Sequence, residues 1–275
     1  MKINFDNVSF RYTNKINVLS NVSLNLNKNE IIFILGASGS GKSTLVNHMN
    51  GLLFASEGNV TLSDQEGIYK LNRKFKNIKH VRKNVGLVFQ IPENQIFENT
   101  VLKEVMFGPI NFKESEEEAK RASVLSLELM GMREEFHEKS PFKLSGGEKR
   151  KVAIASVLAC KPRVLIFDEP TSSLDSKSVN EFFKMVSDLK SRGNTIIIVS
   201  HNSDLAYEYG DRIIILDSGR IIYDGDYNSA FNNVDLLSIA KIDVPFVVKM
   251  KNKFNINEEC RTIKELANLI RGDTL

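Results

Sequence analysis

Residues 36–44 read G-A-S-G-S-G-K-S-T, and this stretch constrains the fold of the chain more than any other. It matches the pattern G-x-x-x-x-G-K-[ST] of a phosphate-binding loop. The five residues before it, 31–35, are all apolar, as in a strand that is buried on both faces. Residues 43–49 contain neither glycine nor proline, so they can form a helix. We therefore predict a strand, a phosphate-binding loop and a helix in direct succession.

The residue types of this loop suit a polyphosphate. A helix start offers unpaired N–H groups and a partial positive charge, and glycines let the backbone curve closely around phosphates. Lys42 can reach the β- and γ-phosphates, and the Ser43 hydroxyl is placed to bind Mg²⁺. A glycine- and serine-rich turn would contain these residues only by chance, so we predict a nucleotide-binding protein. The predicted ATP-binding residues of the loop are Gly36, Ala37, Ser38, Gly39, Ser40, Gly41, Lys42, Ser43 and Thr44.

Composition places the chain among ordinary globular proteins. Of its 275 residues, 42% are hydrophobic and 26% are charged, and the net charge of +3 is too small to indicate nucleic acid or anionic lipid. Cys160 and Cys260 match no metal-ligand spacing, so we expect free thiols in a reducing compartment. We find no signal-peptide pattern and no apolar run near the ~20 residues that span a bilayer. We expect a soluble, cytosolic protein whose membrane role depends on a partner.

The order of apolar runs predicts an α/β fold. Residues 3–10 and 18–26 alternate between apolar and polar, which indicates an antiparallel layer ahead of the phosphate-binding loop. Continuous apolar runs at 164–167, 196–199 and 213–216 are separated by helical patterns, as in buried parallel strands. The core sheet is therefore predicted to be mostly parallel.

Two further regions are predicted to be helical. Residues 91–160 form an inserted helical subdomain, and residues 226–275 form a small C-terminal extension with helical patterns at 227–240 and 262–271. The lysine- and arginine-rich segment 70–83 is either an RNA-binding patch or a solvated loop. We favour the loop, because the segment contains a single aromatic residue for stacking on bases.

Two carboxylates follow one of the buried strands. Asp168 and Glu169 come directly after the run 164–167. Beside a phosphate-binding loop, Asp168 can hold Mg²⁺, and Glu169 can orient or deprotonate the attacking water. His201 follows another strand at its carboxyl end, where ligands gather in open α/β sheets. A lone histidine is more often structural, but this position favours a contact with the γ-phosphate or the water.

A second glycine-containing helix start lies in the helical region. Its residues are Leu144, Ser145, Gly146, Gly147 and Glu148, and a helix is predicted over 149–159. The two glycines free backbone N–H groups that suit phosphate. One nucleotide has no use for two such sites in one chain. Two chains arranged head-to-tail would use both, whereas the alternative is an ordinary helix cap.

These elements, in this order, resemble the ATP-binding cassette of ABC transporters over residues 1–225. The motifs that carry the resemblance are G-A-S-G-S-G-K-S-T at 36–44, Gln90 after a strand, L-S-G-G-E at 144–148, V-L-I-F-D-E-P at 164–170, S-S-L-D at 172–175 and His201. The resemblance implies an ATPase that uses Mg²⁺. It further implies that Tyr12 stacks on adenine and that Gln90 joins Mg²⁺ and the nucleophilic water to a transmembrane partner. Asp175 would act across a dimer interface, and His201 would contact the γ-phosphate.

Further segments resemble the ATPases of energy-coupling-factor (ECF) uptake transporters for vitamins and metals. These are N-H-M-N-G-L-L at 47–53, V-G-L-V-F-Q-I-P-E-N-Q-I-F-E at 85–98, F-G-P at 107–109, G-E-K-R-K-V-A-I-A at 147–155, and V-P-F at 244–246 with T-I-K-E-L-A at 262–267. Residues 107–112 favour the second of two paralogous ATPase types. The resemblance implies a heterodimer with the other paralogue, or a homodimer, on the cytoplasmic face of the cell membrane. It also implies a transmembrane coupling subunit and a substrate-binding membrane component, without nucleic acid.

Two positions depart from the family pattern. Glu148 stands where the wider family usually has Gln, and Ser173 stands where this subgroup usually has Gly, at the expected dimer contact. Ser173 could make the two ATP sites of the dimer unequal. We nevertheless predict that this chain contributes a competent half to each of the two sites.

Two alternatives stay open. A soluble cassette that acts on nucleic acid or ribosomes generally has two cassettes or a long coiled-coil insertion, which this chain lacks. A regulatory cassette that binds ATP without hydrolysis is disfavoured by Asp168, Glu169 and His201.

Overall fold

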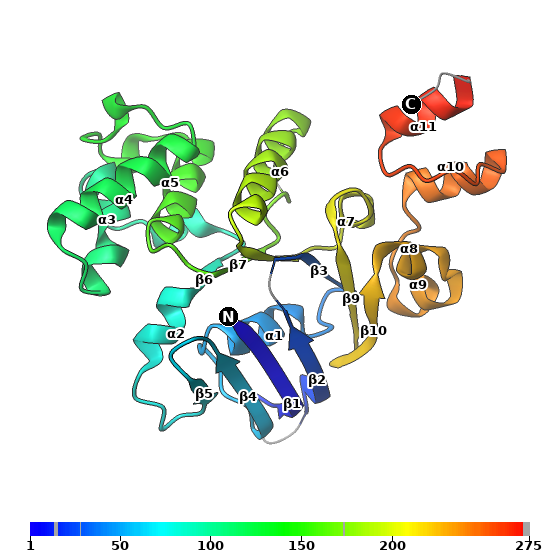
Figure 1. Cartoon of the computed structure of the whole chain (residues 1–275), viewed down its shortest axis with the longest axis horizontal. Helices are drawn as coiled ribbons and strands as arrows, with labels where there is room; N and C mark the ends of the chain where they lie inside the picture. The colour runs from blue at the N-terminus through cyan, green and yellow to red at the C-terminus, as the bar shows by residue number, and fades with distance from the viewer. Residues whose placement is uncertain (14–15, 28, 173, 272–275) are drawn as a thin grey trace.

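The computed structural model describes residues 1–13, 16–27, 29–172 and 174–271, and a six-stranded sheet forms its centre (Figure 1). The strand order is β10-β9-β3-β8-β7-β6. Neighbouring strands are parallel except β10, which is antiparallel to β9. The mostly parallel core sheet is thus confirmed. Its strands are β3 (Ile31–Leu35), β6 (Val85–Val88), β7 (Val164–Asp168), β8 (Thr195–Val199), β9 (Arg212–Asp217) and β10 (Arg220–Asp226).

A second sheet forms the predicted antiparallel layer, in the order β2-β1-β4-β5. Inward-facing residues of β1, such as Ile3 and Phe5, are buried and alternate with exposed polar residues. This alternation is the pattern that predicted a strand with one solvated face. The strands are β1 (Lys2–Phe10), β2 (Leu19–Leu26), β4 (Glu57–Ser63) and β5 (Ile68–Leu71).

Strand β3 is buried on both faces, which explains its unbroken apolar sequence. Phe33 and Leu35 belong to a core shared with helices α6 (Ser176–Ser191) and α7 (Ser203–Tyr209). The alternate residues Ile32 and Ile34 belong to a second core, shared with the antiparallel sheet and helix α1 (Lys42–Met49). Two packed layers therefore fix the strand from which the phosphate-binding loop leaves.

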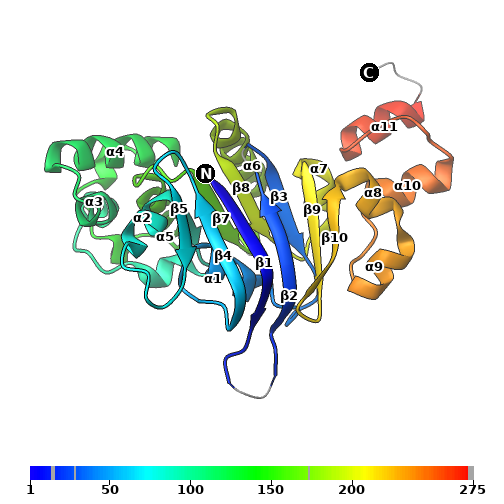
Figure 2. The same ribbon diagram turned by 60° about the horizontal axis from the view of Figure 1, so that its bottom comes forward.

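The remaining helices lie at opposite ends of the core sheet (Figures 1 and 2). Helices α3, α4 and α5 form the helical subdomain at the β6 end and enclose a separate core that includes Val105, Leu127 and Val152. Helices α8 to α11 form the C-terminal extension beyond β10. The bounds are α2 (Ile78–Asn84), α3 (Val101–Asn111), α4 (Glu116–Leu129), α5 (Gly146–Leu158), α8 (Tyr227–Asn232), α9 (Val234–Ala240), α10 (Phe246–Phe254) and α11 (Ile263–Arg271).

The structure departs from the sequence analysis in two places. The segment 70–83 is no simple solvated loop, because β5 extends into it and α2 begins at Ile78, with Val81 fully buried among its cations. Helix α10 was not predicted, since few of its residues are buried: Val247 and Val248 belong to the core, and the partly buried Met250 packs against it.

Candidate functional site

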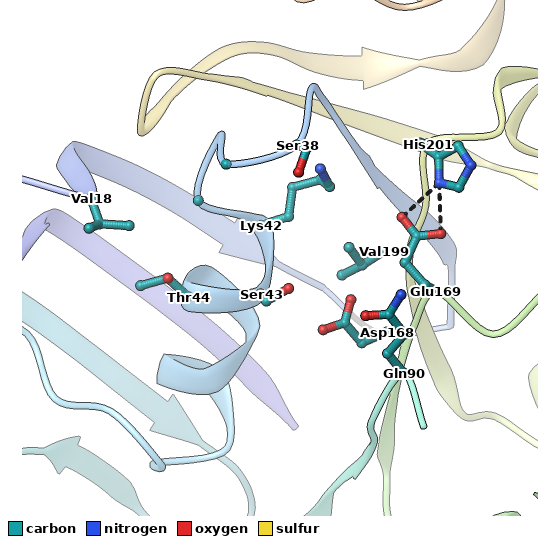
Figure 3. Close-up of a pocket in the computed structure, with 12 residues that line it drawn as sticks. Val18, Ser38, Lys42, Ser43, Thr44, Gln90, Asp168, Glu169, Val199 and His201 are labelled. Carbon is teal, nitrogen blue, oxygen red and sulfur yellow. Dashed lines mark hydrogen bonds and ion pairs between the residues drawn. The ribbon is translucent and has the colours of Figure 1, made fainter. Parts of the chain in front are cut away.

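A cavity of about 410 Å³ opens where strands β3, β6, β7 and β8 end (Figure 3). The phosphate-binding loop forms one side, and residues that follow the other strands face it. Parallel strands present their carboxyl ends at one edge, so residues distant in sequence meet there. The lining residues are Val18, Ser38, Gly39, Gly41, Lys42, Ser43, Thr44, Gln90, Asp168, Glu169, Val199 and His201.

The backbone of the phosphate-binding loop requires glycine at two positions. Gly36 has a φ of 144°, and a Cβ added there would lie 2.2 Å from the Leu216 carbonyl oxygen. Gly41 has a φ of 106°, and its Cβ would lie 2.9 Å from the Val18 carbonyl oxygen. Gly41 is also the N-cap of α1, and no described side chain caps that helix. The first N–H groups of α1 are therefore left for a ligand.

Lys42 is held by its own loop. Its Nζ donates to the carbonyl oxygens of Gly36, at 2.7 Å, and Ala37, at 2.9 Å. Burial lowers the pKa of Lys42, and the charges of Glu169 and Asp168 oppose this shift. A phosphate group would therefore replace two neutral carbonyl acceptors with a charged one, which forms stronger hydrogen bonds with an ammonium group.

Ser43 and Asp168 offer oxygen atoms to a hard cation. Burial raises the pKa of Asp168, while a hydrogen bond with the Ser43 side chain lowers it. The adjacent Glu169 raises this pKa further, and the Lys42 charge opposes it. Gln90 contributes an amide on the same side of the cavity (Figure 3). This donor set fits Mg²⁺, which takes few protein oxygens and completes its shell with phosphate and water.

Glu169 is held in an uncommon backbone conformation. Its φ is 50°, a left-handed value that costs a non-glycine residue about 1–2 kcal/mol. Its N–H donates to the Val199 carbonyl oxygen at 2.9 Å, and both carboxylate oxygens lie 3.0 Å from His201 Nδ1. The Glu169 side chain is largely shielded, whereas that of His201 is exposed. The fold thus places the Glu169 carboxylate, which is carried on a strained backbone and paired with a histidine, across the cavity from Lys42 (Figure 3).

The second glycine-containing helix start lies outside this cavity. Ser145 caps α5: its Oγ accepts from the Glu148 N–H at 3.3 Å and donates to the Glu148 carboxylate at 2.7 Å. The Ser145 N–H also donates to that carboxylate, at 2.8 Å, which completes a capping box. A Cβ added at Gly146 or Gly147 would meet no atom of the described chain within 4 Å. The chain's own packing therefore does not require glycine at either position.

A sequence model of the ABC transporter family matches residues 19–172. The energy-coupling factor transporter ATP-binding protein EcfA2 of Lactobacillus gasseri is 39% identical, over 98% of this chain and 96% of that protein. EcfA2 of Mycoplasma pneumoniae is 41% identical, over 88% of this chain and 80% of that protein. The chain belongs to the family of ECF-type ABC transporter ATPases.

Solved structures of other ABC ATPases share its fold. CbiO1 of Clostridium perfringens, part of the ABC transporter complex cbiONQ, has a TM-score of 0.75 and 31% identity over 98% of both chains. The bacterial cassette MJ0796, solved as a dimer, has a TM-score of 0.72 and 32% identity over 82% of this chain and 98% of its own. The predicted cassette fold, ATPase activity and ECF-type membership are therefore confirmed.

The structure of this ECF-type ATPase assembles only part of the predicted site. Ser38, Gly39, Gly41, Lys42, Ser43 and Thr44 of the loop line the cavity together with Gln90, Asp168, Glu169 and His201, whereas Gly36, Ala37 and Ser40 do not. Tyr12 stands apart: it is 62% exposed, and its hydroxyl lies 3.2 Å from Thr44 Oγ1 at the edge of the site. Asp175 caps α6 by accepting from the Ser178 N–H at 2.7 Å. The role predicted for Ser173 lies outside the described residues.

Sequence reasoning missed Arg150. This buried cation of α5 donates to the carbonyl oxygen of Pro170, the residue after Glu169. Burial lowers the pKa of Arg150, and the negative charge of Glu93 opposes the shift. Arg150 thus ties the helical subdomain to the residues that follow β7. Its position shortly after the glycines was the only sequence signal, and nothing in the sequence indicated its burial.

Proposed function

We propose that this chain powers an ECF-type importer as one half of a head-to-tail cassette dimer. Each ATP would lie between the Lys42 loop of one subunit and the Ser145-Gly146-Gly147 turn of the other. One observation carries the proposal: the two helix starts suited to phosphate belong to separate regions, and the second has glycines without a role in its own chain. MJ0796, a cassette of the same fold, was solved as a dimer, which supports pairing of two cassettes.

Within each site, we assign the roles from the geometry and from the family resemblance. Tyr12 stacks on adenine, and residues 36–44 bind the phosphates. Ser43, Asp168 and Gln90 would hold Mg²⁺, which would supply positive charge to offset that of the ATP phosphates. Glu169 orients or deprotonates the attacking water. His201 fixes the Glu169 carboxylate in the state described here and contacts the γ-phosphate of bound ATP.

A groove beside Gln90 suits a helix of a transmembrane coupling subunit. This cavity of about 350 Å³ lies between the helical subdomain and β6, and it is lined mainly by apolar side chains. Leu52, Phe97 and Phe107 line it and are 40%, 53% and 45% exposed. The rings of Phe97 and Phe107 meet edge to face at 4.7 Å. Exposed apolar surface of this kind marks interaction sites. Because the groove and Gln90 belong to neighbouring stretches of the chain, a subunit docked in the groove would be linked to the ATP site.

We assign residues 1–225 to the cassette, about 91–160 to its helical subdomain and 226–275 to an extension that contributes to dimerisation. Helix α11 supports the last assignment, because its Ile263 and Ile270 are 63% and 49% exposed. The dimer partner is a paralogous ABC ATPase or a second copy of this chain. The complex includes a substrate-binding membrane component for vitamins or transition-metal ions and lies on the cytoplasmic face of the membrane. No described helix is long and apolar enough to cross a bilayer.

The catalytic part of the proposal is tested with Glu169→Gln in the purified transport complex. Turnover should fall at least about 10²-fold, because the amide cannot accept the proton of the water. ATP binding should persist, and ATP should trap the closed dimer. Steady-state ATPase rates, nucleotide affinity and crosslinking between subunits measure these effects. Turnover at the normal rate would contradict the role of Glu169.

The partner assignment is tested by affinity purification from solubilised membranes. Polytopic membrane subunits should co-purify in stoichiometric amounts. A variant with Phe97→Ala and Phe107→Ala should lose them while still binding ATP. Ile68→Ala, which alters a 78% exposed residue on β5, is the matched control. Recovery of ribosomes or nucleic acid without polytopic subunits would favour the soluble alternative instead.

A further inference from the structure

Helix α7 begins two residues after His201 and is short. Asn202 caps it by accepting from the Leu205 N–H at 3.0 Å. With only seven residues, Ser203–Tyr209, the helix depends on tertiary contacts for its stability and direction. The placement of α7 therefore affects the position of His201, whose Nδ1 lies 3.0 Å from the Glu169 carboxylate.

The C-terminal extension holds both ends of α7. At the first turn, the Asp204 carboxylate accepts from the Phe246 N–H at 2.6 Å. At the last turn, Arg261 donates to the Tyr207 carbonyl oxygen from Nε at 2.9 Å and Nη2 at 2.8 Å. Nη2 also donates to the Gly210 carbonyl oxygen at 2.6 Å. Carbonyl groups at a helix end lack partners within the helix, so the guanidinium group supplies what the short helix lacks.

The segment around Arg261 is itself fixed. The Arg261 guanidinium stacks on the Tyr227 ring at 3.8 Å from its centroid, and the Tyr227 hydroxyl donates to Glu259. The buried Tyr207 donates through its hydroxyl to the Cys260 carbonyl oxygen at 3.1 Å. The Arg261 N–H donates to the Glu265 carboxylate at 2.7 Å, at the start of α11. Arg261 therefore links a rigid part of the extension to α7.

We propose that Arg261 is a positioning residue for ATP hydrolysis, and that the extension acts through α7 on His201. The inference rests on the role proposed above for His201. Arg261 touches neither the cavity nor the loop around Lys42, so its loss should leave ATP affinity unchanged. A small displacement of a catalytic group lowers the rate of the chemical step strongly. Contacts that the extension makes, including those in a dimer, would therefore influence the ATP site through α7 and His201.

The test compares variants of the full chain in its purified complex. Arg261→Ala should lower kcat about tenfold and leave the KM for ATP within about twofold. Arg261→Lys should recover part of kcat, because an ammonium group keeps the charge but lacks the planar fork that bridges two carbonyls. Lys264→Ala, an exposed cation of the same extension, should have no effect. An unchanged kcat in Arg261→Ala would overturn the proposal.

A double-mutant cycle separates positioning from general stability. If Arg261 acts through His201, then Arg261→Ala should lower kcat no further in a His201→Ala background. Equal reductions in both backgrounds would overturn the inference, whereas an unchanged kcat in His201→Ala alone would instead overturn the role proposed for His201. Rates are expressed per ATP-binding site, so that unfolded protein does not lower the measured kcat. If Arg261→Ala does not fold, Asp204→Ala breaks the contact at the other end of α7 and enters the same cycle.

Discussion

The two helix starts of this chain that are suited to phosphate differ in how the chain itself uses them. Helix α1 has Gly41 as its N-cap and no side-chain cap, and it begins beside the cavity that Lys42, Asp168 and Glu169 line. Helix α5 begins at Ser145 with a complete capping box and lies away from that cavity. The first is open to a ligand, whereas the second is capped by its own side chains and, in the proposed dimer, would face the nucleotide of the partner.

The glycines show the same difference more sharply. Side chains at Gly36 and Gly41 would collide with backbone carbonyls of this chain, so the fold alone requires glycine there. Side chains at Gly146 and Gly147 would enter open space. Glycine costs a helix about 1 kcal/mol relative to alanine, so its use at the start of α5 needs another reason. Close approach of a partner's nucleotide is a sufficient reason.

The largest expected effect comes from Gly147→Asp. The side chain has room in its own chain, and an acid near a helix start is favourable, so stability should be unchanged or higher. Turnover in the complex should nevertheless fall more than about 10²-fold, because the carboxylate would face the partner-bound phosphates. ATPase rates and thermal unfolding measure the two effects. Loss of stability together with activity would mean that the glycine serves its own fold.

Lys42→Ala should have the next largest effect. Losing a charge-assisted contact to phosphate should weaken ATP binding about 10- to 100-fold, since such contacts contribute about 1.5–3 kcal/mol. Lys151→Ala, a change on α5, is the control and should not alter the affinity of this chain for ATP. Calorimetric titration with ATP measures both, and equal affinity in all proteins would contradict the assignment of the first helix start.

Gly41→Ala should lower the stability of the folded chain. The left-handed conformation costs about 1–2 kcal/mol for a side chain, and the clash with the Val18 carbonyl oxygen adds to it. Gly146→Ala is the matched variant and should stabilise the isolated chain slightly. Denaturant unfolding without nucleotide compares the two variants. Similar unfolding midpoints would contradict the claim that the fold requires glycine at the start of α1 but not at the start of α5.

The smallest effect is expected for Glu148→Gln. Hydrogen bonds with Ser145 lower the pKa of Glu148 below its usual value of 4.5. A lowered pKa means that the ionised group contributes stability above pH 4.5, and that this contribution is lost as the pH falls through the folded-state pKa. The wild type should therefore exceed Glu148→Gln by about 0.5 kcal/mol or less at pH 7, with no difference at strongly acidic pH. Unfolding midpoints at both pH values measure this, and a difference that grows towards acid would contradict the capping role.

Much of the core could be predicted from the sequence, because its signals are local. The apolar run of β3 and the glycines after it specify a buried strand and a tight loop without reference to distant residues. Helix α10 and the segment 70–83 were misjudged, because their burial depends on surfaces supplied by other elements. No sequence pattern indicated the contacts of Arg150 and Arg261, and only the fold shows that each donates to a backbone carbonyl oxygen of a neighbouring element.

By itself, the sequence determined the phosphate-binding loop, the acidic pair and the order of the buried core strands, since motif spacing and hydrophobic periodicity encode them directly. Only the tertiary structure decided which of these residues meet. It brought His201 to the Glu169 carboxylate, placed the Ser145 turn away from Lys42 and joined the C-terminal extension to α7. The physical reason is that contacts across long stretches of chain depend on how whole layers pack, which short sequence patterns do not record.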